Sequence, residues 1–481
     1  MKRIGVAALL SFLIAGCGGG TTQVKKGQSV RTLTGKKKKK SFIEEEELTE
    51  KKIEVKKAPE YIPGVDKGAQ DAFRAGVKAV MKTPPDYATA RAKFEEAIAK
   101  DPKFLEAYFN LGMVYERQGQ QEKALQVYHR ALKANPKSLD AKAYIAKVYL
   151  AKAKKAKKLG RSLEASTMEQ KAKQLLDEVI NQNPDNVAGL NAMALYWLYK
   201  GDLKSTEDYV KRVLMLQPNN VVGLNTRGLV NYLSGKYLIA RWIFEEKALK
   251  IDKNSTEAWN NLGLVYMKLN IVPKAVECFI KALNANPENQ EAMMNLAAIY
   301  LNYLNYKAAY DLYSKVLKLD PENPEALIGM GTSSLGMHKT QDAVKYYLAA
   351  LKVAPQKYIL YKRLGELYET QLNDLEKAVS YYEKYVSLAH PPKTDEVVQK
   401  IPALKQMIQM SKNPPKMAPQ PQEQGNPQPQ GQQPGTQQKQ QKKNQPQQPK
   451  PQKEEKKSPQ GQQKAQPGAG KGKPKVEGGK K

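Results

Sequence analysis

The chain has 481 residues and a net charge of +31, from 79 lysines and arginines against 48 aspartates and glutamates. Its two cysteines exclude a disulfide framework, and three scattered histidines without a cysteine cluster argue against a zinc site. The length allows several domains or one long array, and the basic excess favours an anionic partner or surface, such as acidic lipid, lipopolysaccharide or nucleic acid.

Residues 1–16 have the pattern of a secretory signal. A basic start precedes the apolar run Ile4–Ala15, which is too short to span a bilayer as a mature helix. The ending Leu13–Cys17, LIAGC, resembles a bacterial lipobox. That resemblance implies removal of residues 1–16 and acylation of Cys17, whose acyl chains hold the protein on a membrane. The alternative is an ordinary signal peptide with an incidental cysteine.

Residues 17–67 are predicted to be a charged, flexible tether. Gly18 after the cysteine resembles the sorting pattern of many Gram-negative lipoproteins, which implies the periplasmic face of the outer membrane. Blocks of lysine and of glutamate follow, and such blocks usually stay solvated. The five lysines at 36–40 either contact anionic headgroups or only keep the tether extended.

A 34-residue pattern repeats from residue 68 to residue 392 and is clearest in Thr256–Asn289. Small and apolar residues three or four apart predict two amphipathic helices that pack on each other and on the next copy. The packing positions of this unit are Trp259, Leu262, Gly263, Tyr266, Ala275, Phe279, Ala282 and Pro287. The unit resembles a tetratricopeptide repeat (TPR) in both period and signature residues.

About nine such units follow one another. Their predicted bounds are 68–104, 105–138, 139–186, 187–220, 221–255, 256–289, 290–323, 324–357 and 358–392. The resemblance implies an all-α, right-handed TPR solenoid whose neighbouring repeats stabilise one another. Residues 393–411 are predicted to cap the array with one helix, and Pro402 predicts a break or kink in it. The predicted apolar face of this helix comprises Val397, Val398, Ile401, Leu404, Met407 and Ile408.

Two units depart from the period in an informative way. Leu139–Asn186 is 14 residues longer than the others, which predicts two extra turns on each helix and a reversal near Gly160. This spur is either a solvated extension or a basic docking surface, and its cations are Lys152, Lys154, Lys155, Lys157, Lys158 and Arg161. Val221–Ser255 carries one extra residue, late in its second helix.

Residues 412–481 are predicted to be a disordered tail rich in glutamine, proline and lysine. From Asn413 onward it has fourteen lysines, four glutamates and no aromatic residue, so it cannot bury enough apolar area to fold. Its net charge of +10 suits lipopolysaccharide phosphates or acidic cell-wall groups, or only a soluble spacer. Nucleic-acid binding is disfavoured because no aromatic side chain is present to stack on bases.

The sequence carries no recognisable catalytic or cofactor motif. We find no GxGxxG, Walker A, HExxH or GxSxG in a suitable context, and we therefore expect a non-enzyme without cofactor or metal. Cys278 lies beside Phe279 in an apolar helix, which predicts a small packed side chain rather than a reactive thiol.

Binding is therefore the expected activity. In TPR arrays the first helices line a groove, and their residues outside the packing set meet the partner. Amide and apolar side chains together suit an extended peptide, because asparagine pairs with its backbone and apolar groups form pockets. The alternative is that several of them pack between repeats. The predicted groove residues are Asn191, Leu195, Leu198, Asn225, Leu229, Tyr232, Asn260, Leu264, Met267, Met294 and Leu301.

The whole layout resembles TPR lipoproteins of Gram-negative outer membranes. The long arrays of adventurous gliding-motility lipoproteins (GltE-type) are the most similar in layout, followed by type IV pilus pilotin lipoproteins. This resemblance implies a lipid-anchored periplasmic scaffold that binds envelope proteins or peptides and assembles or stabilises a machine for motility or pilus biogenesis. Two alternatives are a periplasmic chaperone or regulator that recruits cell-wall enzymes, and the TPR arm of a glycosyltransferase, which would need a catalytic domain.

Overall fold

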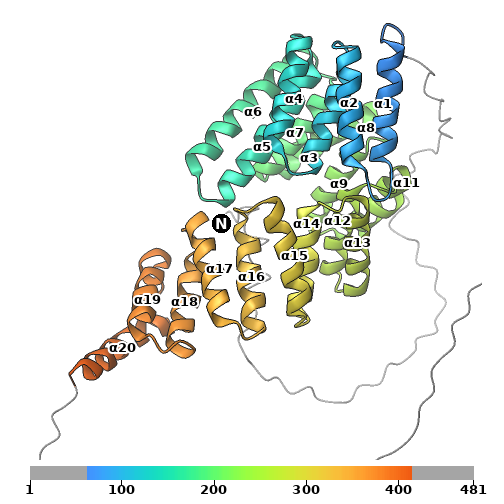
Figure 1. The fold of residues 1–481 in the computed structure, drawn as a ribbon. Coiled ribbons are helices and arrows are strands. Elements are labelled where there is room, and N and C mark those ends of the chain that lie inside the picture. The colour runs from blue at the N-terminus through green and yellow to red at the C-terminus, as the bar shows by residue number, and fades with distance from the viewer. Residues whose placement is uncertain (1–61, 414–481) are drawn as a thin grey trace, which may run out of the picture. The chain divides into compact units, whose positions relative to one another are not determined.

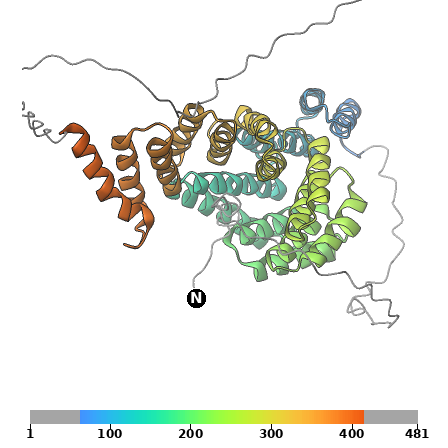
Figure 2. The ribbon, with the colours of Figure 1, turned by 90° about the horizontal axis from the view of Figure 1, so that it is seen from below.

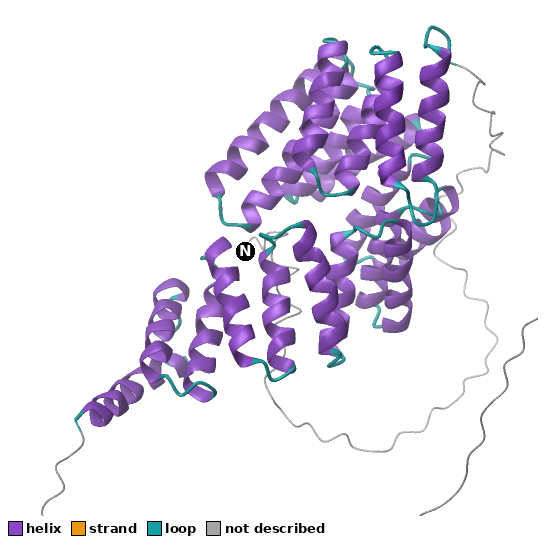
Figure 3. Ribbon diagram, viewed as in Figure 1, coloured by secondary structure: helices purple, strands orange, loops and turns teal. Residues whose placement is uncertain are grey.

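The computed structural model describes residues 62–413, and the regular elements in this range are all helices (Figures 1 and 3). This confirms the predicted all-α class. The predicted signal segment 1–16, the lipidation site Cys17, all but the end of the tether and the tail from residue 414 lie outside the described residues.

Within residues 62–413 the helices form nine antiparallel pairs followed by one further helix. The pairs of the first five repeats are α1 (Lys67–Val80) with α2 (Tyr87–Lys100), α3 (Leu105–Arg117) with α4 (Gln121–Ala134), α5 (Leu139–Lys158) with α6 (Ser162–Gln182), α7 (Val187–Lys200) with α8 (Leu203–Leu216), and α9 (Val221–Leu233) with the continuous segment α10 (Tyr237–Trp242), η2 (Ile243–Ala248) and α11 (Leu249–Ile251). The remaining helices are α12 (Thr256–Lys268) with α13 (Val272–Ala285), α14 (Gln290–Asn302) with α15 (Tyr306–Leu319), α16 (Pro324–Gly336) with α17 (Thr340–Val353), α18 (Tyr358–Thr370) with α19 (Leu375–Ala389), and finally α20 (Glu396–Lys412).

Each helix packs on its neighbours in the chain, and several first helices also pack on the first helix of the next repeat. Contacts of this kind join α5 to α7, α7 to α9 and α9 to α12, whereas second helices approach one another much less closely. The first helices therefore lie on the inner side of the array. Figure 2 shows the helices stacked one after another along the chain. This arrangement of stacked pairs is a TPR solenoid.

A glycine in the first helix makes room for an aromatic ring from the second. A Cβ atom on Gly263 would lie 2.6 Å from Cε1 of Phe279, a ring that is completely buried. Two helices can approach this closely only where one of them has no side chain. The same pairing recurs as Gly76–Phe94, Gly112–Tyr128, Gly228–Phe244, Gly331–Tyr347 and Gly365–Tyr382.

The start of each central first helix is fixed by a polar side chain. Asn220 Oδ1 accepts the backbone N–H of Gly223 at 2.8 Å, which satisfies one of the free donors of the first turn. The residues at this position in five consecutive repeats are Asn186, Asn220, Ser255, Asn289 and Asn323.

The long third repeat folds as predicted. Helices α5 and α6 have 20 and 21 residues, against 13 or 14 in the neighbouring repeats. The chain reverses at Gly160, whose φ of +75° lies in the left-handed region that glycine adopts without strain. The end of this hairpin makes ion pairs with later repeats, and the side chains of Lys154, Lys155 and Arg161 still keep exposed fractions of 58%, 46% and 46%. The extension is therefore solvated and also in contact with the array.

The extra residue of the fifth repeat is absorbed by a π-helix. The segment η2 lies where the sequence places the insertion, late in the second helix. A π-helical turn takes up one residue without ending the helix. Phe244 and Ala248 on either side of the insertion consequently both stay fully buried.

The capping helix α20 is continuous, so the predicted break at Pro402 does not occur. Val397 and Leu404 are buried against α19 on either side of the proline, and this packing outweighs the loss of one helical hydrogen bond. Met407, predicted on the apolar face, is 54% exposed.

Candidate functional site

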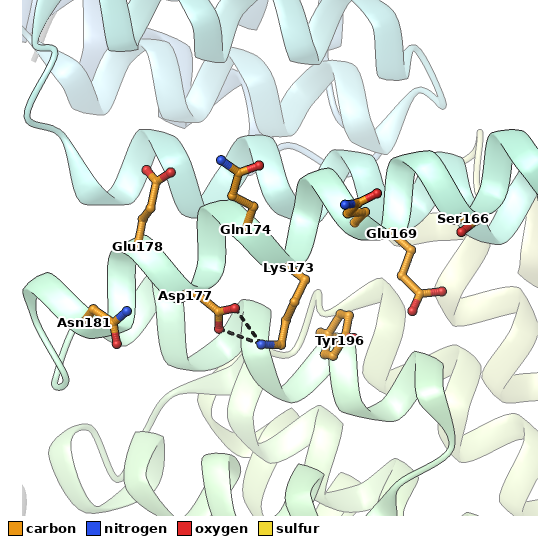
Figure 4. Close-up of a pocket in the computed structure, with 9 residues that line it drawn as sticks. Ser166, Glu169, Lys173, Gln174, Asp177, Glu178, Asn181 and Tyr196 are labelled. Atoms are coloured by element: carbon orange, nitrogen blue, oxygen red, sulfur yellow. Dashed lines mark hydrogen bonds and ion pairs between the residues drawn. The ribbon is translucent and has the colours of Figure 1, made fainter.

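A hollow among the described residues lies on α6 and has a volume of about 690 Å³ (Figure 4). Its lining is mostly polar and comprises Ser166, Glu169, Gln170, Lys173, Gln174, Asp177, Glu178, Asn181 and Tyr196.

The charges of this hollow are already paired. Lys173 Nζ lies 2.6 Å from Asp177 Oδ2, as Figure 4 shows. Glu169 is 2.6 Å from Lys200, and Glu178 is 3.0 Å from Lys142. A ligand would have to break these pairs to use the same groups, so we do not assign a site there.

The predicted groove residues lie on the four consecutive first helices α7, α9, α12 and α14, and we call this set the inner strip. Nine of the eleven are half-buried, and none is exposed. The structure therefore brings the predicted residues together in neighbouring repeats on the inner side of the array.

The asparagines of the inner strip connect one repeat to another. Asn191 Nδ2 donates to Oδ1 of Asn220 at 3.4 Å, and Asn225 Nδ2 donates to Oγ of Ser255 at 3.3 Å. Both acceptors cap the first helix of the following repeat. Asn225 is only 8% exposed, so the packing alternative describes it better than contact with a peptide.

Asn260 has a similar position between repeats. It is 3% exposed, and its Oδ1 accepts a hydrogen bond of 2.9 Å from Nδ2 of Asn295 in the next repeat. Asn295 was not among the predicted residues. Asn295 lies one position later in its repeat than Asn260 does in its own, so the repeat pattern does not predict that the two meet. Only the geometry between neighbouring first helices brings them together.

The apolar members and Asn191 are the accessible part of the inner strip. Leu229, Leu264 and Met267 are half-buried at the edge of the same hydrophobic core. Burial, reinforced by nearby Tyr237, raises the pKa of Tyr232 to about 12, so this side chain is neutral at physiological pH. The remaining apolar members of the strip are Leu195, Leu198, Met294 and Leu301.

The apolar members of the inner strip suit recognition of apolar side chains. The residues between 62 and 413 contain no group of three or more metal-binding side chains. Cys278 is 3% exposed, and burial raises the pKa of its thiol to about 12, which leaves it unreactive at neutral pH. None of the described helices combines the length and apolar composition needed to cross a membrane.

The stacked helix pairs and the apolar inner strip define a repeat scaffold of the kind that mediates protein–protein interactions. Tetratricopeptide-repeat family models match residues 86–139, 328–391, 256–289 and 158–186. The chain therefore belongs to the tetratricopeptide-repeat family.

Two curated relatives are similar to part of the chain. The photosystem I assembly protein Ycf3 of Rippkaea orientalis is 31% identical over 124 residues, which are 24% of this chain and 70% of the relative. Ycf3 of Acaryochloris marina is 36% identical over 83 residues, so the chain spans about half of that relative, 48%, and 16% of itself.

A solved structure with a similar fold is the APC/C hetero-tetramer Cut9–Hcn1. The match has a TM-score of 0.56 and covers 70% of this chain and 64% of the other. Its sequence identity is 11%, so the similarity concerns the fold alone.

Proposed function

We propose that this protein is a lipid-anchored periplasmic scaffold whose inner strip binds a protein partner and thereby assembles or stabilises an envelope machine. The observation that carries the proposal is the ladder of half-buried apolar side chains on four successive first helices. A partner that covers Leu229, Leu264 and Met267 would bury the apolar area they still expose, at roughly 25 cal/mol per Å².

The partner's binding segment is apolar. Axes of packed helices lie about 8–10 Å apart, so the strip offers apolar side chains at about that interval. A helix with apolar residues seven apart repeats them on one face at about 10 Å, and a polyproline II segment with apolar residues three apart repeats them on one face at about 9 Å. Both arrangements fit the strip.

An assembly role is supported by the relatives. Both curated matches are named as assembly proteins of photosystem I, so proteins similar to this one serve the construction of a multiprotein complex. We transfer only this general role, and we propose gliding motility or pilus biogenesis for this chain because of its lipoprotein layout.

The lipid anchor of the proposal is Cys17, with the outer membrane as its location. The lipobox-like sequence before it supports this assignment. Metabolic labelling with palmitate should label the protein, and the Cys17→Ala variant should lose the label and leave the membrane fraction. Equal labelling of both proteins would contradict the anchor.

The binding surface is tested by a crosslinked pull-down from envelope fractions with the full chain. The variant Leu229→Asp/Leu264→Asp places two carboxylates in the inner strip and should lose the captured partner. The matched control Leu238→Asp/Ile280→Asp changes two exposed side chains on second helices and should capture as the parent does. Equal capture by both variants would contradict the proposal.

The identity of the captured proteins separates the two candidate functions. Recovery of motility or pilus components supports the envelope machine. Recovery of cell-wall hydrolases or synthases instead supports the alternative, a regulator that recruits these enzymes.

A further inference from the structure

The end of the α5–α6 hairpin contacts residues that lie far away in the chain. Lys155 Nζ is 2.8 Å from Oδ1 of Asp320, a residue 165 positions later. Arg161 Nη2 lies 3.5 Å from Oε2 of Glu322. Figures 1 and 2 both place this end of the hairpin beside α16 and α17.

A third ion pair joins the same hairpin to the seventh repeat. Lys154 Nζ is 3.5 Å from Oε1 of Glu291 in the first turn of α14. The positive charge of Lys154 lowers the pKa of the Glu291 carboxyl, so this acid is ionised throughout the neutral range.

Two hydrogen bonds to backbone carbonyls accompany the ion pairs. Gln356 Nε2 donates to the carbonyl of Lys158 at 3.1 Å, and Asn286 Nδ2 donates to the carbonyl of Arg117 at 3.1 Å. We call these five contacts the clasp. It joins the turns inside repeats two and three to the turns that follow repeats six, seven and eight.

The clasp is polar and partly exposed. Each hydrophobic cluster of the described residues stays within consecutive repeats, so none of them crosses the clasp. The side chains of Lys154 and Glu291 are 58% and 67% exposed. Ion pairs of this kind contribute little stability and are screened by salt.

The position of the clasp in the chain links it to the inner strip. Helices α7, α9 and α12 lie between its two sides in the sequence, so the clasp closes a loop of chain that contains most of the strip. We propose that the clasp is a reversible electrostatic latch, closed at low ionic strength and opened by screening or by charge reversal. The proposal of a latch rests on the five contacts of the clasp. An effect of its opening on partner access to the inner strip rests in addition on the proposed function.

A zero-length crosslinker tests the latch in the full chain. Carbodiimide joins a lysine amine to a carboxylate only when the two are in contact. We expect a Lys155–Asp320 crosslink in dilute buffer. Mass spectrometry gives the ratio of its yield to the yield of the Lys142–Glu178 crosslink, which lies inside the third repeat. In about 1 M NaCl the Debye length falls to about 3 Å, and this ratio should fall roughly tenfold.

Charge reversal tests the same claim without salt. The variant Lys154→Glu/Arg161→Glu leaves both crosslinked residues in place, yet it should lower the Lys155–Asp320 ratio in dilute buffer. Adding Glu291→Lys/Glu322→Lys should restore the ratio. The control Lys133→Glu/Lys137→Glu changes exposed lysines outside the clasp and should leave the ratio unchanged.

Three results would overturn the latch. One is the absence of the crosslink in dilute buffer, which would mean that the contacts do not form. Another is a ratio unaffected by both salt and charge reversal, which would show a fixed contact. The third is a crosslink found only between chains when isotopically labelled and unlabelled protein are mixed.

Discussion

At the scale of single residues, stability depends on glycines that face aromatic rings. The inner helices can pack closely because Gly263 and its counterparts leave room for the rings of the second helices. The period and the residue types of these pairs could be read from the sequence, since an interval of three or four fixes which side chains share a helix face.

Replacing Gly263 by alanine should destabilise the protein. Alanine favours the helical backbone by roughly 1 kcal/mol, but its Cβ would lie 2.6 Å from the buried Phe279 ring. Overpacking costs about 1–3 kcal/mol, and so short a contact with a fully buried ring belongs at the upper end of this range. After the helical gain we expect a net loss of about 1–2 kcal/mol in the free energy of unfolding. Denaturant titration measures it, and Asn284→Ala on the exposed side of α13 is the control. A Gly263→Ala protein as stable as its parent would contradict the packing argument.

The raised pKa of Tyr232 makes stability sensitive to alkaline pH. The pKa is about 12 in the folded protein and 10.0 without burial, so the unfolded chain loses this proton first. The stabilisation of the folded protein by neutral Tyr232 is fully present below about pH 10 and is lost as the pH rises to about 12. Unfolding titrations between about pH 9 and pH 12 should show a smaller loss for Tyr232→Phe than for the parent. Identical losses would mean that Tyr232 ionises equally well in both states.

The functional assignment of single residues was harder to predict than the packing. The position of Leu264 and of Asn225 within the repeat predicts that both lie on the inner face of a first helix, and the structure places them there. It does not reveal that Asn225 meets the capping residue Ser255 of the next repeat, because that contact depends on the rotation between repeats. Binding of a partner by the apolar members of the inner strip remains a prediction.

At the scale of elements, most departures from the regular repeat have a local cause. The added turns of α5 and α6 follow from fourteen extra residues, and η2 follows from one. The break predicted in α20 does not occur. Its cause is not local, because packing of α20 on α19 overrides the preference of Pro402 for a helix end.

Deleting Lys247 should convert η2 into an ordinary α-helix. The deletion brings Ala248 to the position that alanine has in the other second helices, so Phe244 and Ala248 keep their burial. We expect the free energy of unfolding to stay within about 1 kcal/mol of the parent. Deleting Lys281 from the regular helix α13 instead rotates Ala282 out of the core and should cost about 2–5 kcal/mol. Similar losses for the two deletions would contradict this reading of the insertion.

At the scale of the whole molecule, repeats that are distant in sequence come together at the clasp. The sequence identified the basic spur but could not show that Lys155 meets Asp320, because this contact depends on the summed rotation of five repeats. The inner strip, which we propose as the partner-binding surface, lies mostly in the loop of repeats between the two sides of the clasp.

Binding of a protein partner on the inner strip can be tested by site-specific photocrosslinking in the native host, which reports contact at a single residue. A photoreactive amino acid replaces Leu264 in one protein and Ile280, which is exposed on the second helix of the same repeat, in another. We predict a discrete protein adduct from position 264 and little or none from position 280. An adduct formed from position 280 but not from position 264 would contradict partner binding on the inner strip.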